Sequence, residues 1–276
     1  MTPLEILTNN ANATRLPDAT YEDMTLKTRD DSSALMDQKD FCFMSKLYTA
    51  SSQYYWDVIW RINSGSQSNI DLRCLMKQHL NDYAGIEQWL AAGANITEFQ
   101  VDPVNPWALI PRTKVRYIDF VLPDIVWISP TMLPDDEPTT GPGTTPSADC
   151  YVIDVRFLNG SHPGGFIPLP PDSAVTMHAP FWFKIWIDQS TFVEYRIEEY
   201  LEDGTLLRVI TADQSDWHAV SGLSGKYWVE ERNFYDIPTG WTSQLTVSAP
   251  DTTSISTSVF SSTYLNSSEF CPDPEA

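Results

Sequence analysis

The residues that could carry chemistry in this chain are mainly carboxylates, with a few histidines. Asp213, Asp216 and His218 lie close together in the sequence, and carboxylate and imidazole groups are ligands for metal ions. Asp216 and His218 are two positions apart, which places them on one face of a strand. A solvated strand edge explains the same residue types more simply, so we expect no metal site here.

Paired carboxylates are a second candidate for chemistry. Glu198-Glu199 and Glu230-Glu231 are adjacent pairs, and neighbouring strand residues point to opposite faces, so neither pair can act as a catalytic dyad. The chain contains none of the motifs G-x-S-x-G, G-x-x-x-x-G-K-[ST], G-x-G-x-x-G or H-E-x-x-H, which mark common hydrolase, phosphate and zinc sites. We therefore expect no catalytic residue and no cofactor.

The charge balance narrows the choice of partners. The chain has 17 basic and 37 acidic residues and a net charge of −20. Nucleic acids and anionic membrane surfaces attract basic patches, so they are not expected as partners. No apolar run approaches the roughly 20 residues that span a bilayer, so we expect no transmembrane segment.

The cysteines bear on the compartment. Cys42, Cys74, Cys150 and Cys271 are four in number, with no C-x-x-C spacing, which favours disulfides over zinc. If the chain works outside the cytoplasm, we expect a Cys150–Cys271 bridge, with Cys42 and Cys74 paired or left as buried thiols, although the sequence leaves all three full pairings of four cysteines open. N-x-S/T sequons start at Asn12, Asn95, Asn159 and Asn266. These features favour an extracytoplasmic protein, periplasmic or secreted, whose leader is absent from this chain; a reduced cytoplasmic protein is the alternative.

Three regions are expected along the chain. Residues 1–33 are polar and weakly periodic, typical of a flexible arm. Residues 34–248 are expected to form a single domain, interrupted by a Pro/Thr-rich loop at 131–149. Residues 249–276 are rich in Ser and Thr and are expected to form a mobile tail unless Cys271 attaches it.

The first half of the domain shows two periodicities. Residues 53–62 alternate, with Trp56, Val58 and Trp60 on one face, which indicates a strand. Residues 68–92 carry apolar side chains at three- and four-residue intervals and end at Gly93, which predicts a helix.

The second half predicts an antiparallel meander. Strands are expected at 181–188, 192–201, 205–212, 226–236 and 241–247, with an Asp203-Gly204 hairpin turn. Loops this short place consecutive strands side by side. One face of this sheet is apolar, and the other carries Glu194, Glu198, Arg208 and Glu230, so we expect it to face solvent.

This meander resembles the LolA-like outer-membrane lipoprotein-sorting family. The similarity lies in Phe183-Lys-Ile-Trp-Ile-Asp188, in Tyr195-Arg-Ile-Glu-Glu-Tyr-Leu-Glu-Asp-Gly-Thr-Leu-Leu-Arg-Val209, and in the later Tyr235-Asp-Ile-Pro-Thr-Gly240 turn. It covers a quarter to a third of the chain. The resemblance implies an α+β fold: a strongly curved antiparallel sheet, like a half-barrel, with one or few helices across the concave face. An NTF2-like curved sheet is the alternative.

The resemblance also implies an apolar ligand between sheet and helices. Ten tryptophans and the shortage of predicted helices to fill a concave sheet agree with a ligand cavity. We expect the apolar strand face of the meander to line it, through Phe183, Ile185, Ile187, Val193, Tyr195 and Ile197.

Three functions follow as hypotheses. The first is a non-catalytic, monomeric, extracytoplasmic carrier for lipid, lipoprotein acyl chains or another apolar ligand. The second is an enzyme using the same pocket, with Asp188, His178 or His218 as acid or base. The third is an envelope or surface structural protein, which should expose a large apolar patch or an edge strand.

Overall fold

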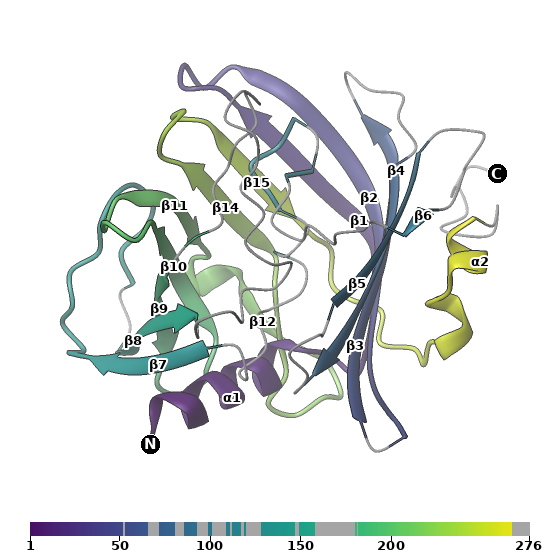
Figure 1. The fold of residues 1–276 in the computed structure, drawn as a ribbon, viewed down its shortest axis with the longest axis horizontal. Helices are drawn as coiled ribbons and strands as arrows, with labels where there is room; N and C mark the ends of the chain where they lie inside the picture. Colours follow the sequence, from purple (N-terminus) through teal and green to yellow (C-terminus); the bar gives the residue numbers. More distant parts are fainter. Residues whose placement is uncertain are drawn as a thin grey trace.

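Antiparallel strands make up most of the computed structural model (Figure 1). It describes residues 1–51, 53–65, 72–80, 86–92, 99–100, 109–110, 112–116, 119, 128–146, 149–157, 180 and 182–266. Within these residues one thirteen-stranded sheet has the order β6-β5-β4-β3-β2-β1-β15-β14-β11-β10-β9-β8-β7, and β12 and β13 form a separate two-stranded sheet. The expected curved antiparallel sheet with few helices is confirmed.

The strands of the main sheet come from both ends of the chain. They are β1 (Asp18–Arg29), β2 (Leu35–Ala50), β3 (Gln53–Gly65), β4 (Leu72–Leu80), β5 (Ile86–Ala92), β6 (Phe99–Gln100), β7 (Ile128–Leu133), β8 (Cys150–Phe157), β9 (Trp182–Asp188), β10 (Glu194–Tyr200), β11 (Leu206–Thr211), β14 (Glu231–Asp236) and β15 (Thr242–Thr246). β1 pairs with β15, from Thr25↔Thr246 to Arg29↔Thr242, and this joins the N-terminal and C-terminal halves into one sheet.

The predicted meander is confirmed at β9, β10, β11 and β15. Asp203-Gly204 forms the β10–β11 turn, where Gly204 has a positive φ that favours glycine. The strand expected at 226–236 is instead two strands, β13 (Tyr227–Val229) and β14. β13 leaves the main sheet and pairs with β12 (Trp217–Ala219), so one continuous apolar pattern in the sequence serves two separate sheets.

The N-terminal residues are not a loose arm. Residues 1–33 contain α1 (Pro3–Thr14) and β1. The Thr2 hydroxyl accepts a hydrogen bond from the Glu5 amide at 3.3 Å, and the Glu5 carboxylate accepts one from the Thr2 amide at 2.7 Å. This capping box, with Pro3 in the first turn, starts the helix. Ile6 and Leu7 then bury one side of α1 against the sheet.

The helix expected at 68–92 is wrong. The described part of that range forms β4 and β5. β4 pairs with β3. The inner face of β4 carries Leu72, Cys74 and Met76, on the same side as Trp60 of β3, and the outer face carries Leu75. A segment with apolar residues on both faces fits the period of a helix and also fits a strand buried on both sides. Pairing of β4 with β3 selects the strand.

The inner, concave face carries the largest core cluster. Alternate residues of consecutive strands share it, for example Phe41 and Phe43 on β2, Val58 and Trp60 on β3, and Phe234 on β14. α1 lies across this face (Figure 1). Strands of period two that all place their apolar residues on one side produce such a face.

The outer face of the C-terminal half is covered by the Pro/Thr-rich loop. The Arg196 guanidinium donates to the carbonyls of Thr140 and Thr144, at 2.6 and 3.3 Å, and the Glu198 carboxylate accepts from the Thr140 amide at 2.6 Å. Gly141 has a φ of +84°, and a Cβ there would lie 2.7 Å from the Leu206 side chain. Only glycine fits that backbone at such close approach. This segment is therefore packed against the sheet.

The outer face of the N-terminal half is covered by the C-terminal tail. Residues 257–265 contain η4 (Thr257–Val259) and α2 (Ser262–Leu265), and α2 lies beside this half of the sheet (Figure 1). Phe260 and Leu265 are buried against Cys42, Met44, Ile59 and Leu75. The expectation of a mobile tail is thus wrong for residues 249–266; residues 267–276 lie outside the described part.

The cysteines do not pair as expected. Cys74 and Cys150 are free, buried thiols, so neither the Cys150–Cys271 bridge nor a Cys42–Cys74 bridge is formed. Both thiols lie within apolar clusters, where burial raises the pKa of the Cys150 thiol to about 12. Cys42 is not among the free thiols, and Cys271 lies outside the described residues.

No helix in the described ranges is long and apolar enough to cross a membrane.

Removing the Phe260 side chain should destabilise the protein. Phe260 is 1% exposed, and Phe→Ala substitutions at such sites cost about 3–5 kcal/mol. Urea unfolding of Phe260→Ala should show this loss, whereas Thr263→Ala, at an exposed position of α2, should stay within about 0.5 kcal/mol of the parent. Equal stabilities for Phe260→Ala and the parent would mean that the tail does not pack on the sheet.

Candidate functional site

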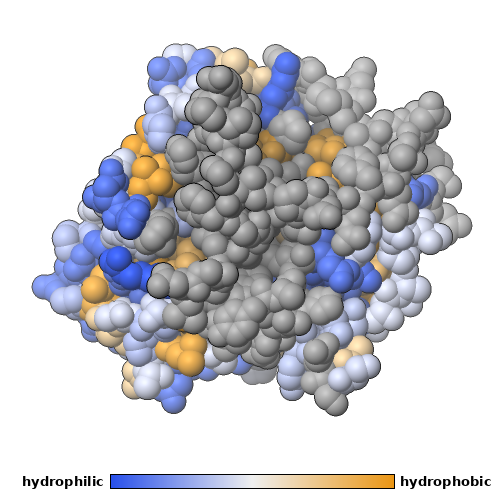
Figure 2. All heavy atoms as spheres, in the orientation of Figure 1, coloured by the Kyte–Doolittle hydropathy of each residue, from blue (hydrophilic) through white to orange (hydrophobic). Residues whose placement is uncertain are grey.

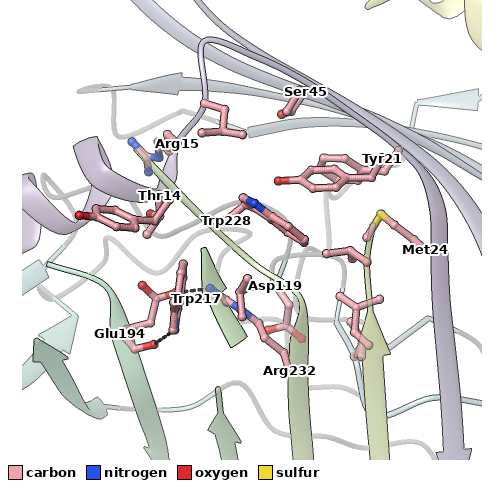
Figure 3. A pocket seen from close by; sticks show the side chains of 18 of the residues that line it. Thr14, Arg15, Tyr21, Met24, Ser45, Asp119, Glu194, Trp217, Trp228 and Arg232 are labelled. Atoms are coloured by element: carbon pink, nitrogen blue, oxygen red, sulfur yellow. Dashed lines mark hydrogen bonds and ion pairs between the residues drawn. The ribbon is translucent and has the colours of Figure 1, made fainter. Parts of the chain in front are cut away.

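A cavity of about 140 Å³ lies on the inner face of the sheet (Figure 3). Its walls come from the end of α1, from β1, β2, β3, β10, β14 and β15, and from the β12–β13 hairpin. The lining residues used below are Arg15, Tyr21, Met24, Phe43, Ser45, Trp56, Asp119, Glu194, Trp217, Tyr227, Trp228, Arg232, Phe234, Leu245 and Val247.

Most of the cavity wall is apolar. Phe43, Trp56, Phe234 and Leu245 belong to the inner core cluster and are buried on the same face. Their position follows from strand alternation, since each lies on an inward-facing position of its strand. The β12–β13 hairpin closes the opposite side with aromatic rings. The cavity is therefore a gap between two apolar surfaces.

An ion pair at one side of the cavity attaches the neighbouring elements. Glu194 is held by the Arg232 guanidinium and by the Asn10 side-chain amide, the latter at 2.6 Å. Asn10 also donates to the Phe192 carbonyl at 2.8 Å, which fixes α1 to the end of β10. The Trp217 indole donates to the Glu194 carbonyl at 3.1 Å, and the Arg232 guanidinium lies 5.4 Å from the Trp217 ring (Figure 3). All of these charges have partners.

A buried ionic network adjoins the cavity. Glu199 accepts hydrogen bonds from Arg116 at 2.6 Å and from Arg208 at 2.7 and 3.0 Å, while both terminal nitrogens of Arg208 donate to Asp119 at 2.6 and 2.7 Å. Burial alone raises the pKa of Glu199, but the two guanidinium groups outweigh it and hold this pKa below its usual value. Asp119, which lines the cavity, is thereby committed to Arg208.

The charged face expected to meet solvent is therefore buried. Arg208 and Glu198 are both fully buried, and Glu194 is 5% exposed; only Glu230 of the four is exposed. Arg208 faces inward with Glu199, its cross-strand partner, whereas Glu198 faces outward beneath the 139–145 loop. Charges can be buried here because each is paired and hydrogen-bonded.

Three hydrogen-bonding groups on the cavity wall differ from these paired charges. Tyr21 and Ser45 are diagonal neighbours on adjacent strands, because Tyr21 pairs with Phe43 and Ser45 lies two residues beyond Phe43 on the same face. Trp228 packs in one cluster with Tyr21. Among the described residues, no hydrogen bond is formed by the Tyr21 hydroxyl, the Ser45 hydroxyl or the Trp228 indole nitrogen. Burial raises the pKa of the Tyr21 hydroxyl, so it stays protonated.

The six apolar residues predicted to line a ligand site are separated by the structure. Phe183, Ile185, Ile187 and Ile197 lie in or against the inner core cluster. Val193 and Tyr195 lie in a different cluster with Cys150, Val152 and Trp186. A register shift between Glu194 and Arg196 breaks the alternation of β10, which puts Tyr195 out of phase with Ile197. None of the six lines the cavity of Figure 3, and their role in ligand binding stays a prediction.

The residues considered for acid–base chemistry lie elsewhere. Asp188 holds the β9–β10 turn: its carboxylate accepts from the amides and hydroxyls of Ser190 and Thr191. Burial raises its pKa, but these bonds outweigh burial and leave the pKa lowered. His218 is half-buried, 3.0 Å from Glu230, and His178 is outside the described residues. No group of three metal-binding side chains occurs in the described ranges.

Several site residues were missed by the sequence reasoning. The Thr2-x-x-Glu5 capping box with Pro3 was a readable signal for α1. Trp217 and Trp228 entered the sequence analysis only among the ten tryptophans that agree with a ligand cavity. Arg232, Tyr21 and Ser45 had no local signal, because strands distant in sequence bring them together.

Known proteins resemble this chain in structure only. No family model and no curated protein sequence matches it. A putative outer membrane lipoprotein-sorting protein domain from Vibrio parahaemolyticus superposes with a TM-score of 0.71 at 14% identity, covering 95% of this chain and 97% of that one. A DUF1329 family protein from Desulfovibrio piger gives 0.72 at 11% identity, covering 96% and 100%.

A LolA superfamily protein from Nitrosomonas europaea gives a TM-score of 0.63 at 16% identity, covering 96% of this chain and 99% of that one. Agreement over nearly the whole of both chains shows that this protein has the LolA-like fold. The resemblance first indicated by the meander therefore extends to the first half of the chain. Identities this low establish the fold and leave function to be argued from the site.

Replacing Glu199 tests the buried network. Glu199→Gln removes the buried carboxylate that Arg116 and Arg208 share, while Arg208 keeps Asp119 as an ionic partner. The free energy of unfolding at pH 7 should therefore fall by about 3–5 kcal/mol. Because the folded-state pKa of Glu199 is lowered, its stabilisation is present above the ordinary glutamate pKa and is lost as pH falls through the folded-state value. The stability gap between parent and variant should therefore narrow in acid.

Urea unfolding at several pH values measures this gap. Glu202→Gln, at an exposed position, is the matched control and should shift stability by less than about 0.5 kcal/mol. A gap for Glu199→Gln that is independent of pH would contradict the network's electrostatic role.

Proposed function

We propose that this protein is a non-catalytic, extracytoplasmic binding or carrier protein for an apolar ligand, with lipid acyl chains as the ligand class. The observation that carries the proposal is the apolar cavity on the inner face of a LolA-like sheet. It is formed where the aromatic β12–β13 hairpin and the end of α1 cover that face without filling it.

The similar structures support a binding role. One of them is a putative outer membrane lipoprotein-sorting protein domain and another a LolA superfamily protein. In this protein the curved sheet and α1 likewise enclose an apolar inner face, on which a lipid acyl chain could lie. Burial of each methylene of such a chain is worth about 0.8 kcal/mol.

The size of the cavity implies movement on binding. At about 140 Å³ it is smaller than the roughly 300–1,000 Å³ of typical ligand pockets. The β12–β13 hairpin is not hydrogen-bonded into the main sheet as a strand, so it is the wall that can shift at least cost. A ligand longer than a few carbons would displace this hairpin from the apolar face.

An enzyme is supported less well by the same geometry. Catalysis needs polar groups that converge on a substrate and are free to exchange protons. In the described part of the cavity, Glu194 is paired with Arg232, and Asp119 is paired with Arg208. These charges hold the walls together.

A structural surface protein is also supported less well. Large exposed hydrophobic side chains among the described residues are Met1, Leu4, Leu35 and Tyr54. On the face shown in Figure 2, hydrophobic side chains lie in small separate groups among hydrophilic ones. Assembly through an apolar face would require a larger continuous patch.

A disulfide would favour an extracytoplasmic location. Since Cys74 and Cys150 are free thiols, the remaining pair is Cys42 with Cys271, and we propose that these two form a disulfide. Cys42 is buried beside Phe260 and Leu265 of the tail. A bridge from Cys42 to the end of the chain would hold this cover on the outer face.

Removing the Trp228 side chain tests the carrier function. Trp228→Ala takes away an aromatic wall of the cavity and should weaken binding of a fluorescent fatty acid, such as cis-parinaric acid, about tenfold or more. Trp241→Ala is the matched control, because Trp241 is also partly buried but does not line the cavity. Fluorescence titration compares the two variants with the parent.

Native mass spectrometry of gently purified protein provides the second readout. We expect co-purifying lipid-sized adducts on the parent. A parent protein that carries no adduct and binds no fatty acid would rule out the carrier function.

Thiol counting tests the proposed disulfide. The denatured, unreduced protein should show two reactive thiols, from Cys74 and Cys150, and four after reduction. Peptide mapping should recover a Cys42–Cys271 linked pair. Four thiols without reduction would remove both the disulfide and its support for an extracytoplasmic location.

A further inference from the structure

The cavity contains hydrogen-bonding capacity that the described protein does not use. Tyr21, Ser45 and Trp228, named here the polar corner, line an otherwise apolar cavity (Figure 3). Ser45 is 1% exposed. No hydrogen bond joins the polar atoms of these three side chains to any described residue. Polar groups that face a cavity in an otherwise apolar wall are expected where water or a ligand supplies their hydrogen-bond partner.

The geometry brings the three side chains to one part of the wall. Tyr21 and Ser45 project from adjacent strands on the inner face, in a diagonal relation that follows from the Tyr21↔Phe43 pair. In Figure 3 the hydroxyl end of Tyr21 points toward the Trp228 ring. The Tyr21 ring is fixed by Phe43, with ring centroids 5.6 Å apart, and the Trp228 ring by His218, at 5.0 Å. Packing within the sheet therefore orients Tyr21, and packing within the β12–β13 hairpin orients Trp228.

The chemistry of the corner selects an acceptor. The indole N–H of Trp228 only donates, and the hydroxyls of Tyr21 and Ser45 donate readily. Arg15 also lines the cavity, whereas the nearby carboxylates Glu194 and Asp119 are neutralised by their arginine partners. The corner thus presents three hydrogen-bond donors, and no unpaired carboxylate among the described lining residues would repel a negative ligand atom. Such a site suits a ligand oxygen that accepts hydrogen bonds.

We propose that the polar corner binds the carbonyl oxygen of an acyl ligand, a carboxylate or an ester, while its hydrocarbon chain lies along the apolar wall. This assignment rests on the proposed carrier function and adds to it the part of the ligand that is recognised. The apolar wall that receives the chain consists of Met24, Phe43, Phe234, Leu245 and Val247.

Binding of three probes with one chain length tests the assignment. The probes are lauric acid, 1-monolauroylglycerol and dodecane, measured by displacement of a fluorescent fatty acid. Tyr21→Phe and Ser45→Ala each remove one hydroxyl and keep the packing. Each should weaken binding of a carbonyl-bearing probe about 3- to 10-fold, the value of one lost hydrogen bond, and leave dodecane unchanged.

Tyr151→Phe is the matched control, because Tyr151 packs against the inner core but does not line the cavity. It should bind all three probes like the parent. Thermal unfolding of each variant verifies that it is folded, and Ser45→Ala provides an independent result if Tyr21→Phe does not fold.

The outcomes separate the two proposals. A loss for lauric acid alone identifies a free carboxylate as the recognised group, and a loss for both carbonyl probes identifies the carbonyl common to acid and ester. A parent that binds all three probes, with variants that lower none of them or lower dodecane equally, overturns the polar corner and leaves the carrier function standing. A parent that binds none of the probes overturns the carrier function itself.

Discussion

The structure depends on one constraint: the long sheet is apolar on both faces, and each face has to be covered. Strand alternation divides the side chains strictly between two sides, so the inward residues Phe41, Val58 and Phe234 cannot be buried by the elements that bury the outward residues Met44 and Leu75. The inner face is covered by α1 and the β12–β13 hairpin. The outer face is covered by the 139–145 loop and by the tail.

Burial of charge follows from the same constraint. β10 and β11 carry Glu198, Glu199 and Arg208 within the sheet, and once both faces are covered these groups lose contact with water. Desolvation of single charges would be prohibitive. Each is therefore paired, Glu198 with Arg196 on the outer side and Glu199 with Arg208 on the inner side. Such networks favour one packing arrangement, because breaking any member leaves a buried charge alone.

The cavity is a gap that the described elements leave on the inner face. Asn10 attaches α1 to β10, and Glu194 attaches β10 to Arg232 of β14, so the walls are joined to one another around the gap. The hairpin that completes the enclosure is held by side-chain packing of Trp228 and Val220 and by hydrogen bonds from Trp217 and Lys226. A wall of this kind combines a preformed apolar surface with a part that can move to admit a ligand, which is what the proposed carrier function needs.

The sequence by itself determined the features that depend on neighbours along the chain. The alternation of Phe183, Ile185 and Ile187 and the Asp203-Gly204 turn were sufficient to predict β9, β10 and β11 and to indicate the curved sheet. The Thr2–Glu5 capping box is also a local signal, and it marks the start of α1. The polar composition of residues 1–33 favoured a flexible arm instead, so this signal was not used.

Only the tertiary structure decided features that depend on distant partners. Residues 72–80 and 86–92 have apolar side chains compatible with either a helix or doubly buried strands, and pairing of β4 with β3 and β5 made them strands. The bulge in β10 moved Tyr195 to a different cluster from Ile197. Arg208 is buried because a loop segment brings Asp119 to it, and Tyr21, Ser45 and Trp228 meet because β1, β2 and β13 are joined through the sheet and its cover. Periodicity reports which residues share a face, but burial and contact between faces arise only when the whole sheet is assembled.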